Sequence, residues 1–174
     1  YPAVCSNAGA VTLTGTPSGG TFSGTGVSGN SFTPSVGAGT YTIAYSYTNA
    51  NSCSDSTSTS ITVNAAPSVN AGTYATVCTN SPVVSLSGSP AGGTFSGTGV
   101  SGSTFNPATG AGTYTINYSY TAANSCSNTA STSITVSSIP SVNAGTYSAV
   151  CTNSSAITLS GTPAGGTLSG TGVT

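Results

Sequence analysis

Hydrophobic and polar residues alternate along much of the chain with a period of two. The clearest run covers residues 41–48, where the odd positions are large and apolar and the even positions are small: Tyr41, Ile43, Tyr45 and Tyr47 against Thr42, Ala44, Ser46 and Thr48. Successive side chains of a β-strand point to opposite faces, so this run predicts a strand with one aromatic face and one polar face. Shorter runs over 11–14 and 60–64, and around Cys5, Phe22 and Phe32, predict further strands. No segment has the period of a helix.

Clusters of Gly, Pro, Ser and Asn separate these runs and predict turns at residues 16–20, 24–29, 37–39 and 49–51. Six or seven short strands within this length predict an all-β fold, and more specifically an immunoglobulin-like β-sandwich. Because Ile43 shares a face with the tyrosines, we expect that face to pack in the core. The alternative is an exposed aromatic platform for sugars.

The whole pattern repeats every 73 residues without a gap, and about 50 of the first 73 positions are identical in the second copy. We therefore predict tandem domains: repeat 1 over residues 1–66, repeat 2 over 67–139, and a partial, truncated repeat 3 over 140–174. Short connectors around Pro67 and Pro140 predict a rod in which each domain mainly contacts its neighbours.

The cysteines follow the same period, and the two cysteines within a copy are 48 residues apart. We expect one disulfide in each repeat, tying its two sheets together: Cys5–Cys53, Cys78–Cys126, and Cys151 with a partner beyond Thr174. The odd cysteine could instead be a reactive thiol or form an intermolecular link. A disulfide that closes such a loop stabilises a fold by about 4 kcal/mol in the chain-entropy model.

The side-chain composition excludes several classes of function. The 174 residues include no Lys, Arg or His, and Asp55 is the only acidic residue. Such a chain lacks the groups for acid–base catalysis and for phosphate binding, so we expect neither an enzyme nor a nucleic-acid-binding protein. Two lone cysteines per copy, without His or a CxxC motif, do not form a zinc site. No apolar run approaches the roughly 20 residues of a membrane span, so we expect no membrane insertion.

The motif GTGVSG occupies residues 24–29 and 97–102 and matches G-x-G-x-x-G, the dinucleotide-binding pattern. That pattern needs a helix after it and an acidic residue about 20 positions later. Residues 30–34 read NSFTP, which does not predict a helix, and Asn49 and Ala122 stand where the acid is required. We therefore expect no cofactor, and interpret the glycines as turn residues with positive φ.

The motifs GGTFSGTGVSG, GAGTYTI and NSCS lie at residues 19–29, 37–43 and 51–54 and recur at fixed spacing. Together they resemble the immunoglobulin-like repeats of very large secreted surface proteins of Bacteroidetes, among them gliding-motility adhesins and other type IX secretion cargo. The resemblance covers the whole chain and implies an extracellular or cell-surface location, as disulfides also do.

These bacteria attach O-glycans at short motifs that begin with Asp, and Asp55-Ser56-Thr57 fits such a motif. The resemblance thus makes Ser56 a candidate O-glycosylation site. The alternative is that Asp55 accepts local hydrogen bonds near a turn.

From the repeat, the cysteines and the missing catalytic groups, we expect a structural segment of an extracellular stalk, fibre or filament, the spacer of a surface adhesin. Its partners would be neighbouring repeats of the same chain and possibly identical chains in a filament or bundle. The alternative is a multivalent adhesin module that binds glycans or cells.

Overall fold

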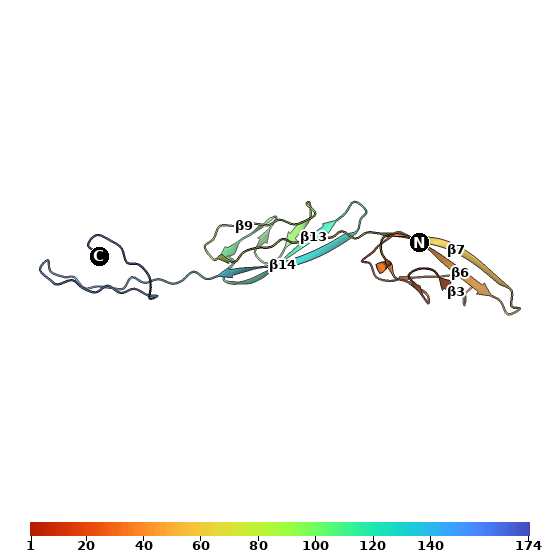
Figure 1. Cartoon of the computed structure of the whole chain (residues 1–174), viewed down its shortest axis with the longest axis horizontal. Helices are drawn as coiled ribbons and strands as arrows, with labels where there is room; N and C mark the ends of the chain where they lie inside the picture. Colours follow the sequence, from red (N-terminus) through yellow and green to blue (C-terminus); the bar gives the residue numbers. More distant parts are fainter.

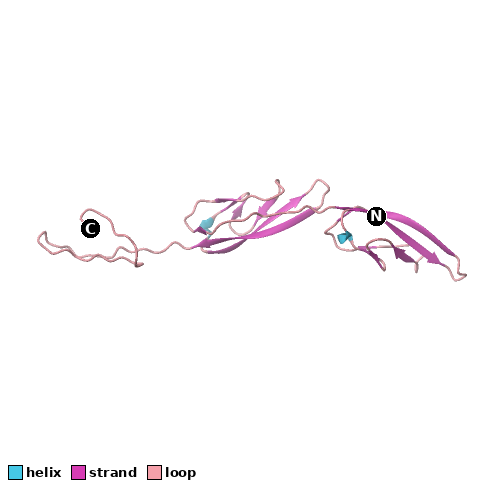
Figure 2. Ribbon diagram, viewed as in Figure 1, coloured by secondary structure: helices cyan, strands magenta, loops and turns pink.

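The computed structural model describes residues 1–174, and the chain is all-β, with no α-helix. Two β units follow one another along the long axis of the molecule, and the segment 138–174 continues beyond them without any strand (Figures 1 and 2). The prediction of an all-β chain with about seven short strands per copy is confirmed.

The first unit contains seven strands and one 3-10 turn, at Pro34–Val36. Its two sheets have the strand orders β1-β7-β6-β3 and β2-β5-β4. The strands are β1 (Val4–Cys5), β2 (Val11–Thr12), β3 (Thr21–Ser23), β4 (Val27–Ser28), β5 (Ser31–Phe32), β6 (Gly39–Thr48) and β7 (Ser54–Asn64).

The second unit repeats this arrangement strand by strand, with its 3-10 turn at Pro107–Thr109. Its sheets have the orders β10-β13-β14-β8 and β11-β12-β9. The strands are β8 (Val77–Cys78), β9 (Val84–Ser85), β10 (Thr94–Ser96), β11 (Val100–Ser101), β12 (Thr104–Phe105), β13 (Gly112–Thr121) and β14 (Ser127–Ser137).

One long antiparallel hairpin forms the backbone of each unit. In the first unit β6 and β7 pair over ten residues, from Gly39 opposite Val63 to Thr48 opposite Ser54. The short strand β1 runs parallel to β7 and pairs only with its last residues, Cys5 being the partner of Asn64. The start of each unit therefore lies at the end of the hairpin that is farthest from its turn.

Each unit has a hydrophobic core made by side chains from both of its sheets. Burial of one such side chain contributes about 1.5–3 kcal/mol, so five of them form the main source of stability in a unit of this size. The buried residues are Leu13, Phe32, Ile43, Ile61 and Val63 in the first unit and Leu86, Phe105, Ile116, Ile134 and Val136 in the second.

Tyrosine hydroxyls lock the turns onto these cores. Tyr118 is 2% exposed, and its hydroxyl accepts a hydrogen bond from the backbone N–H of Gly93 at 2.8 Å and donates one to the carbonyl of Pro90. Tyr45 makes the same two contacts in the first unit, to Gly20 and Pro17. The expectation that these tyrosines pack in the core is confirmed for both.

The GTGVSG segment is a turn between β3 and β5, and no helix follows it. Gly24, Gly26 and Gly29 all have positive φ, of 143°, 80° and 57°. A Cβ atom on Gly24 would lie 2.4 Å from the carbonyl oxygen of Thr42, so this position excludes any side chain. The interpretation of the motif as a turn is confirmed.

We predict that Tyr118→Phe lowers the stability of the second unit by about 1–2 kcal/mol. The loss leaves the N–H of Gly93 and the carbonyl of Pro90 without a partner. Calorimetry should show a melting temperature lower by about 5–10 °C. Tyr120→Phe is the control, since that hydroxyl makes no hydrogen bond, and equal melting temperatures for the two variants would contradict the role of the Tyr118 hydroxyl.

We predict that Gly24→Ala destabilises the first unit by about 2 kcal/mol or more, because the methyl group meets the Thr42 carbonyl and the backbone has positive φ. Gly9→Ala is the matched control, since a Cβ atom at Gly9 would have no other group within 4 Å and the φ of Gly9 is not in the left-handed region. Urea unfolding of both variants measures the difference, and an unchanged midpoint for Gly24→Ala would contradict the prediction.

Candidate interdomain junction

The disulfide of this chain joins the two units instead of the two sheets of one unit. Cys5 of β1 is bonded to Cys126, which precedes β14, with Cα atoms 5.6 Å apart and 121 residues between them in sequence. The predicted pairs Cys5–Cys53 and Cys78–Cys126 are therefore wrong, and so is one intradomain disulfide per repeat. Cys53, Cys78 and Cys151 are free and exposed, and a partner for Cys151 beyond Thr174 stays a prediction.

The register of β1 explains why the predicted pairing fails. Cys5 lies beside Asn64, at the last residue of β7, whereas Cys53 directly precedes the first residue of that strand. Eleven residues of extended strand span roughly 36 Å. A disulfide needs Cα atoms within about 7 Å, so Cys5 and Cys53 cannot meet in this fold.

The β13–β14 turn of the second unit brings Cys126 to Cys5. The turn is closed by a backbone hydrogen bond from Ala122 N–H to the Cys126 carbonyl (2.9 Å), and Ser125 adopts a φ of 63°. The side-chain oxygen of Asn124 accepts the N–H of Cys126 at 3.1 Å, which leaves the amide nitrogen of Asn124 free to point outward. Cys126 is fully buried at the contact.

Three side-chain amides add hydrogen bonds between the units, each 3.0 Å long. Asn124 donates to the carbonyl of Ala65, and Asn128 donates to the carbonyl of Pro67. In the opposite direction, Asn7 of the first unit donates to the carbonyl of Ser127. The hairpin end of the second unit thus grips the end of the first unit and the connector that leaves it.

The connector itself is fixed at both ends. On the side of the first unit, the N–H of Ala66 donates to the hydroxyl of Ser6 at 3.0 Å. On the side of the second unit, Asn70 and Ser89 exchange two backbone hydrogen bonds of 2.8 and 2.9 Å. Only residues 67–69 lie between these attachments, so little freedom remains for one unit to swing against the other.

The disulfide is the largest single term at this junction. Closing a loop of 121 residues stabilises the fold by about 5 kcal/mol in the chain-entropy model. Each neutral hydrogen bond adds only about 0.5–1.5 kcal/mol. The covalent bond therefore holds the units together, and the amides define their angle.

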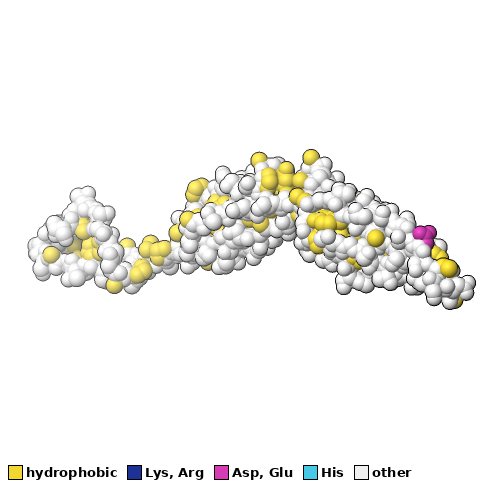
Figure 3. All heavy atoms as spheres, turned by 45° about the vertical axis from the view of Figure 1, so that its right-hand side comes forward, with side chains coloured by type: hydrophobic (Ala, Val, Ile, Leu, Met, Phe, Trp, Pro, Cys, Tyr) yellow, Lys and Arg dark blue, Asp and Glu magenta, His cyan; other side chains and the backbone are white.

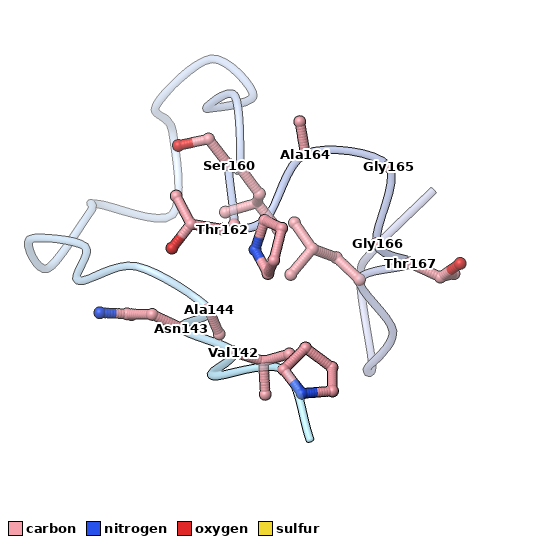
Figure 4. A pocket seen from close by; sticks show the side chains of 14 residues that line it. Val142, Asn143, Ala144, Ser160, Thr162, Ala164, Gly165, Gly166 and Thr167 are labelled. Carbon is pink, nitrogen blue, oxygen red and sulfur yellow. The ribbon is translucent and has the colours of Figure 1, made fainter. Parts of the chain in front are cut away.

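The largest hollow, of about 650 Å³, lies in the third copy, between residues 140–144 and residues 159–168 (Figure 4). Gly161 and Gly166 border it, and they correspond to Gly88 and Gly93 of the second copy, which pack directly against the ring of Tyr118. The hollow thus has the position that a core tyrosine takes in the complete units, and it needs no small-molecule ligand to explain it.

The candidate glycosylation residue Ser56 lies on β7 and is exposed. Asp55 accepts the N–H of Ser56 at 2.8 Å, so the expected local hydrogen bond is confirmed, although in a strand next to the turn. Ser56 as a glycosylation site stays a prediction. The structure brings no group of three or more His, Cys, Asp or Glu side chains together.

No family model matches the chain, and comparison with curated proteins finds no match either. The junction therefore stands on its own geometry.

We predict that a chymotryptic digest of the oxidised protein, with free thiols blocked first, yields one disulfide-linked pair, Tyr1–Phe22 with Thr121–Tyr147. The chain has no Lys or Arg for trypsin, and cleavage after Tyr and Phe leaves each cysteine in a separate peptide. Mass spectrometry without reduction identifies the pair. A link between Tyr1–Phe22 and Thr48–Tyr74 would show the Cys5–Cys53 pairing and contradict the structure.

We predict that Cys126→Ser lowers the free energy of unfolding by about 2–5 kcal/mol, because the loop between the units is no longer closed. Cys53→Ser, at the equivalent position of the first unit, should have no effect, since Cys53 is a free thiol. Thermal unfolding followed by far-UV circular dichroism distinguishes the two, and equal destabilisation would contradict the assignment.

Proposed function

We propose that this chain is a structural repeat segment of an extracellular stalk, fibre or filament, the spacer of a bacterial surface adhesin. The single observation that carries the proposal is the covalent junction between consecutive units. Two units that are joined by the Cys5–Cys126 disulfide and by a connector fixed at both ends keep a constant direction. Figure 1 shows the resulting elongated molecule, with the two units arranged end to end.

We further propose that each unit is an immunoglobulin-like sandwich. Seven strands in a four-stranded and a three-stranded sheet, with a core contributed by both sheets, support this assignment. The resemblance to Bacteroidetes surface repeats supports a bacterial origin and the role of a spacer, which requires many similar domains in series.

The proposed location is outside the cell. A disulfide persists in oxidising compartments and is rare in the cytoplasm. No helix in the chain is long and apolar enough to cross a bilayer.

The nearly uncharged surface supports other repeats as the partners of this protein. In the space-filling view the only charged side chain is one carboxylate, which belongs to Asp55 (Figure 3). Molecules without like charges do not repel one another, so identical chains can lie side by side in a bundle. The absence of basic and acid–base groups fits a role that needs neither catalysis nor nucleic-acid binding.

The alternative function, multivalent binding of glycans or cells, is supported by one exposed surface. Residues 54–60 of β7 are all exposed and are almost all Ser or Thr, which can bond sugar hydroxyls. However, Tyr45 and Tyr118, which an aromatic sugar platform would require, are buried with their hydroxyls already bonded. A glycan array with the oxidised chain tests the alternative directly.

We predict that small-angle X-ray scattering of the monomeric, oxidised chain gives the curve of a single elongated particle. The variant Cys126→Ser with Asn124→Ala and Asn128→Ala removes the disulfide and two hydrogen bonds, so its units should sample a range of angles. Cys53→Ser is the control and should scatter like the parent chain. A compact particle, or identical curves for the parent and the triple variant, would contradict the proposed function.

A further inference from the structure

The first unit carries a second example of the hairpin end that grips it. We call residues 49–55 the hairpin tip; in it Asn51 and Cys53 correspond to Asn124 and Cys126 of the second unit. The backbone turn is the same: the Asn49 N–H bonds to the Cys53 carbonyl at 3.0 Å, and Ser52 has a φ of 60°. The hairpin tip is thus preformed, exposed and without a partner in this chain.

The second unit carries a copy of the surface that such a tip binds. We call this surface the receiving end: Cys78 on β8, Asn80 after it, and the carbonyls of Ser137, Ser138 and Pro140. Cys78 pairs with Ser137 in the register in which Cys5 pairs with Asn64. Asn80 corresponds to Asn7, and the thiol of Cys78 is free and exposed. Both halves of the internal junction are therefore present again, each unoccupied.

The two halves cannot meet within one molecule. The hairpin tip lies at the outer end of the first unit, and the receiving end lies at the far end of the second (Figure 1). The two long hairpins, each roughly 36 Å long, separate them. A partner for either surface must come from another copy of the repeat.

We propose that the hairpin tip of one molecule docks on the receiving end of a second molecule of this chain, and that a Cys53–Cys78 disulfide then joins them. The proposal extends the proposed function from one rod to a fibre of rods and rests on that function. Because the two surfaces differ and lie at opposite ends, the contact is head-to-tail and does not close on itself, so it propagates into a filament.

The disulfide forms by thiol–disulfide exchange with a small disulfide oxidant such as oxidised glutathione. The thiolate of one cysteine attacks the oxidant, forms a mixed disulfide and releases one reduced thiol. The thiolate of the second cysteine attacks the mixed disulfide and releases the other. Two protein thiols are oxidised, and one small-molecule disulfide is reduced to two thiols.

Cys78 is the specific partner, although Cys151 is also free and exposed. Cys78 lies on a strand that pairs with the end of a long hairpin, as Cys5 does. Residues 148–157 around Cys151 form no strand. Only Cys78 is therefore held in the geometry that the internal junction uses.

Asp55 makes this contact different from the internal one. At the internal junction the amide nitrogen of Asn128 donates to the carbonyl of Pro67 at 3.0 Å. Asp55 stands at the equivalent position, and its carboxylate has no proton to donate to the carbonyl of Pro140. The only charged side chain of the chain thus weakens the contact between molecules and leaves the contact within the molecule intact.

The test is oxidation of the purified 174-residue chain in a glutathione redox buffer, followed by a non-reducing gel and a chymotryptic digest. We expect a ladder of multiples of the monomer and a linked pair of Thr48–Tyr74 with Ala75–Phe95, which contain Cys53 and Cys78. Asp55→Asn should raise the initial rate of ladder formation about 2- to 10-fold, the range for one recovered hydrogen bond. Asn51→Ala should lower it, and Cys151→Ser should leave it unchanged.

Other patterns of cross-linking overturn the proposal. These are absence of a ladder, or links distributed at random among Cys53, Cys78 and Cys151 with no effect of Asp55→Asn. Scattering from the monomer separates this result from failure of the proposed function. A rigid monomeric rod without a specific ladder overturns the docking contact alone, whereas a compact monomer overturns the proposed function.

Discussion

The parallel pairing of β1 with the last residues of β7 determines how the repeats are joined. This short contact places Cys5 at the end of the unit where the connector leaves, next to Asn64. The next unit brings its hairpin turn, and with it Cys126, to the same place. Had β1 paired at the opposite end of β7, the two cysteines of one copy would be neighbours, and consecutive units would be joined by the connector alone.

The junction is built from neutral groups, which suits a chain with almost no charge. Amide nitrogens of Asn7, Asn124 and Asn128 donate to backbone carbonyls, and none of these bonds involves an ion pair. Salt screens interactions between charges but leaves hydrogen bonds between neutral groups largely unaffected. The geometry of the rod should therefore depend little on ionic strength, an advantage outside the cell, where ionic strength varies.

The sequence predicted the elements with a strong pattern and missed those specified by their neighbours. The alternation over 41–48 predicted β6, and the glycines of GTGVSG predicted a turn. The strand β7, however, begins at Ser54, six residues before the predicted run, because Ser54–Thr59 are exposed and carry no hydrophobic period; their pairing with β6 makes them a strand. Local pattern alone does not report such a constraint.

The disulfide could not be assigned from spacing for a related reason. In a repeat of 73 residues, a partner 48 positions away within one copy and a partner 121 positions away in the next copy are equivalent in sequence. Only the strand register distinguishes them, since it places Cys5 far from Cys53. The amides of Asn124 and Asn128 gave no signal either, because Asn is common in turns whether or not it contacts a neighbour.

A disulfide between units also changes how the rod carries tension. When the ends of the chain are pulled, force passes from Cys5 directly to Cys126, and the residues between them are bypassed. This segment includes nearly all of the first core and most of the second, so neither can be drawn out while the bond is intact. A bond within one copy, such as Cys5–Cys53, would have left the connector as the only path for force. Joining successive copies therefore gives a rod that is both straighter and harder to extend than one in which each domain carries its own disulfide.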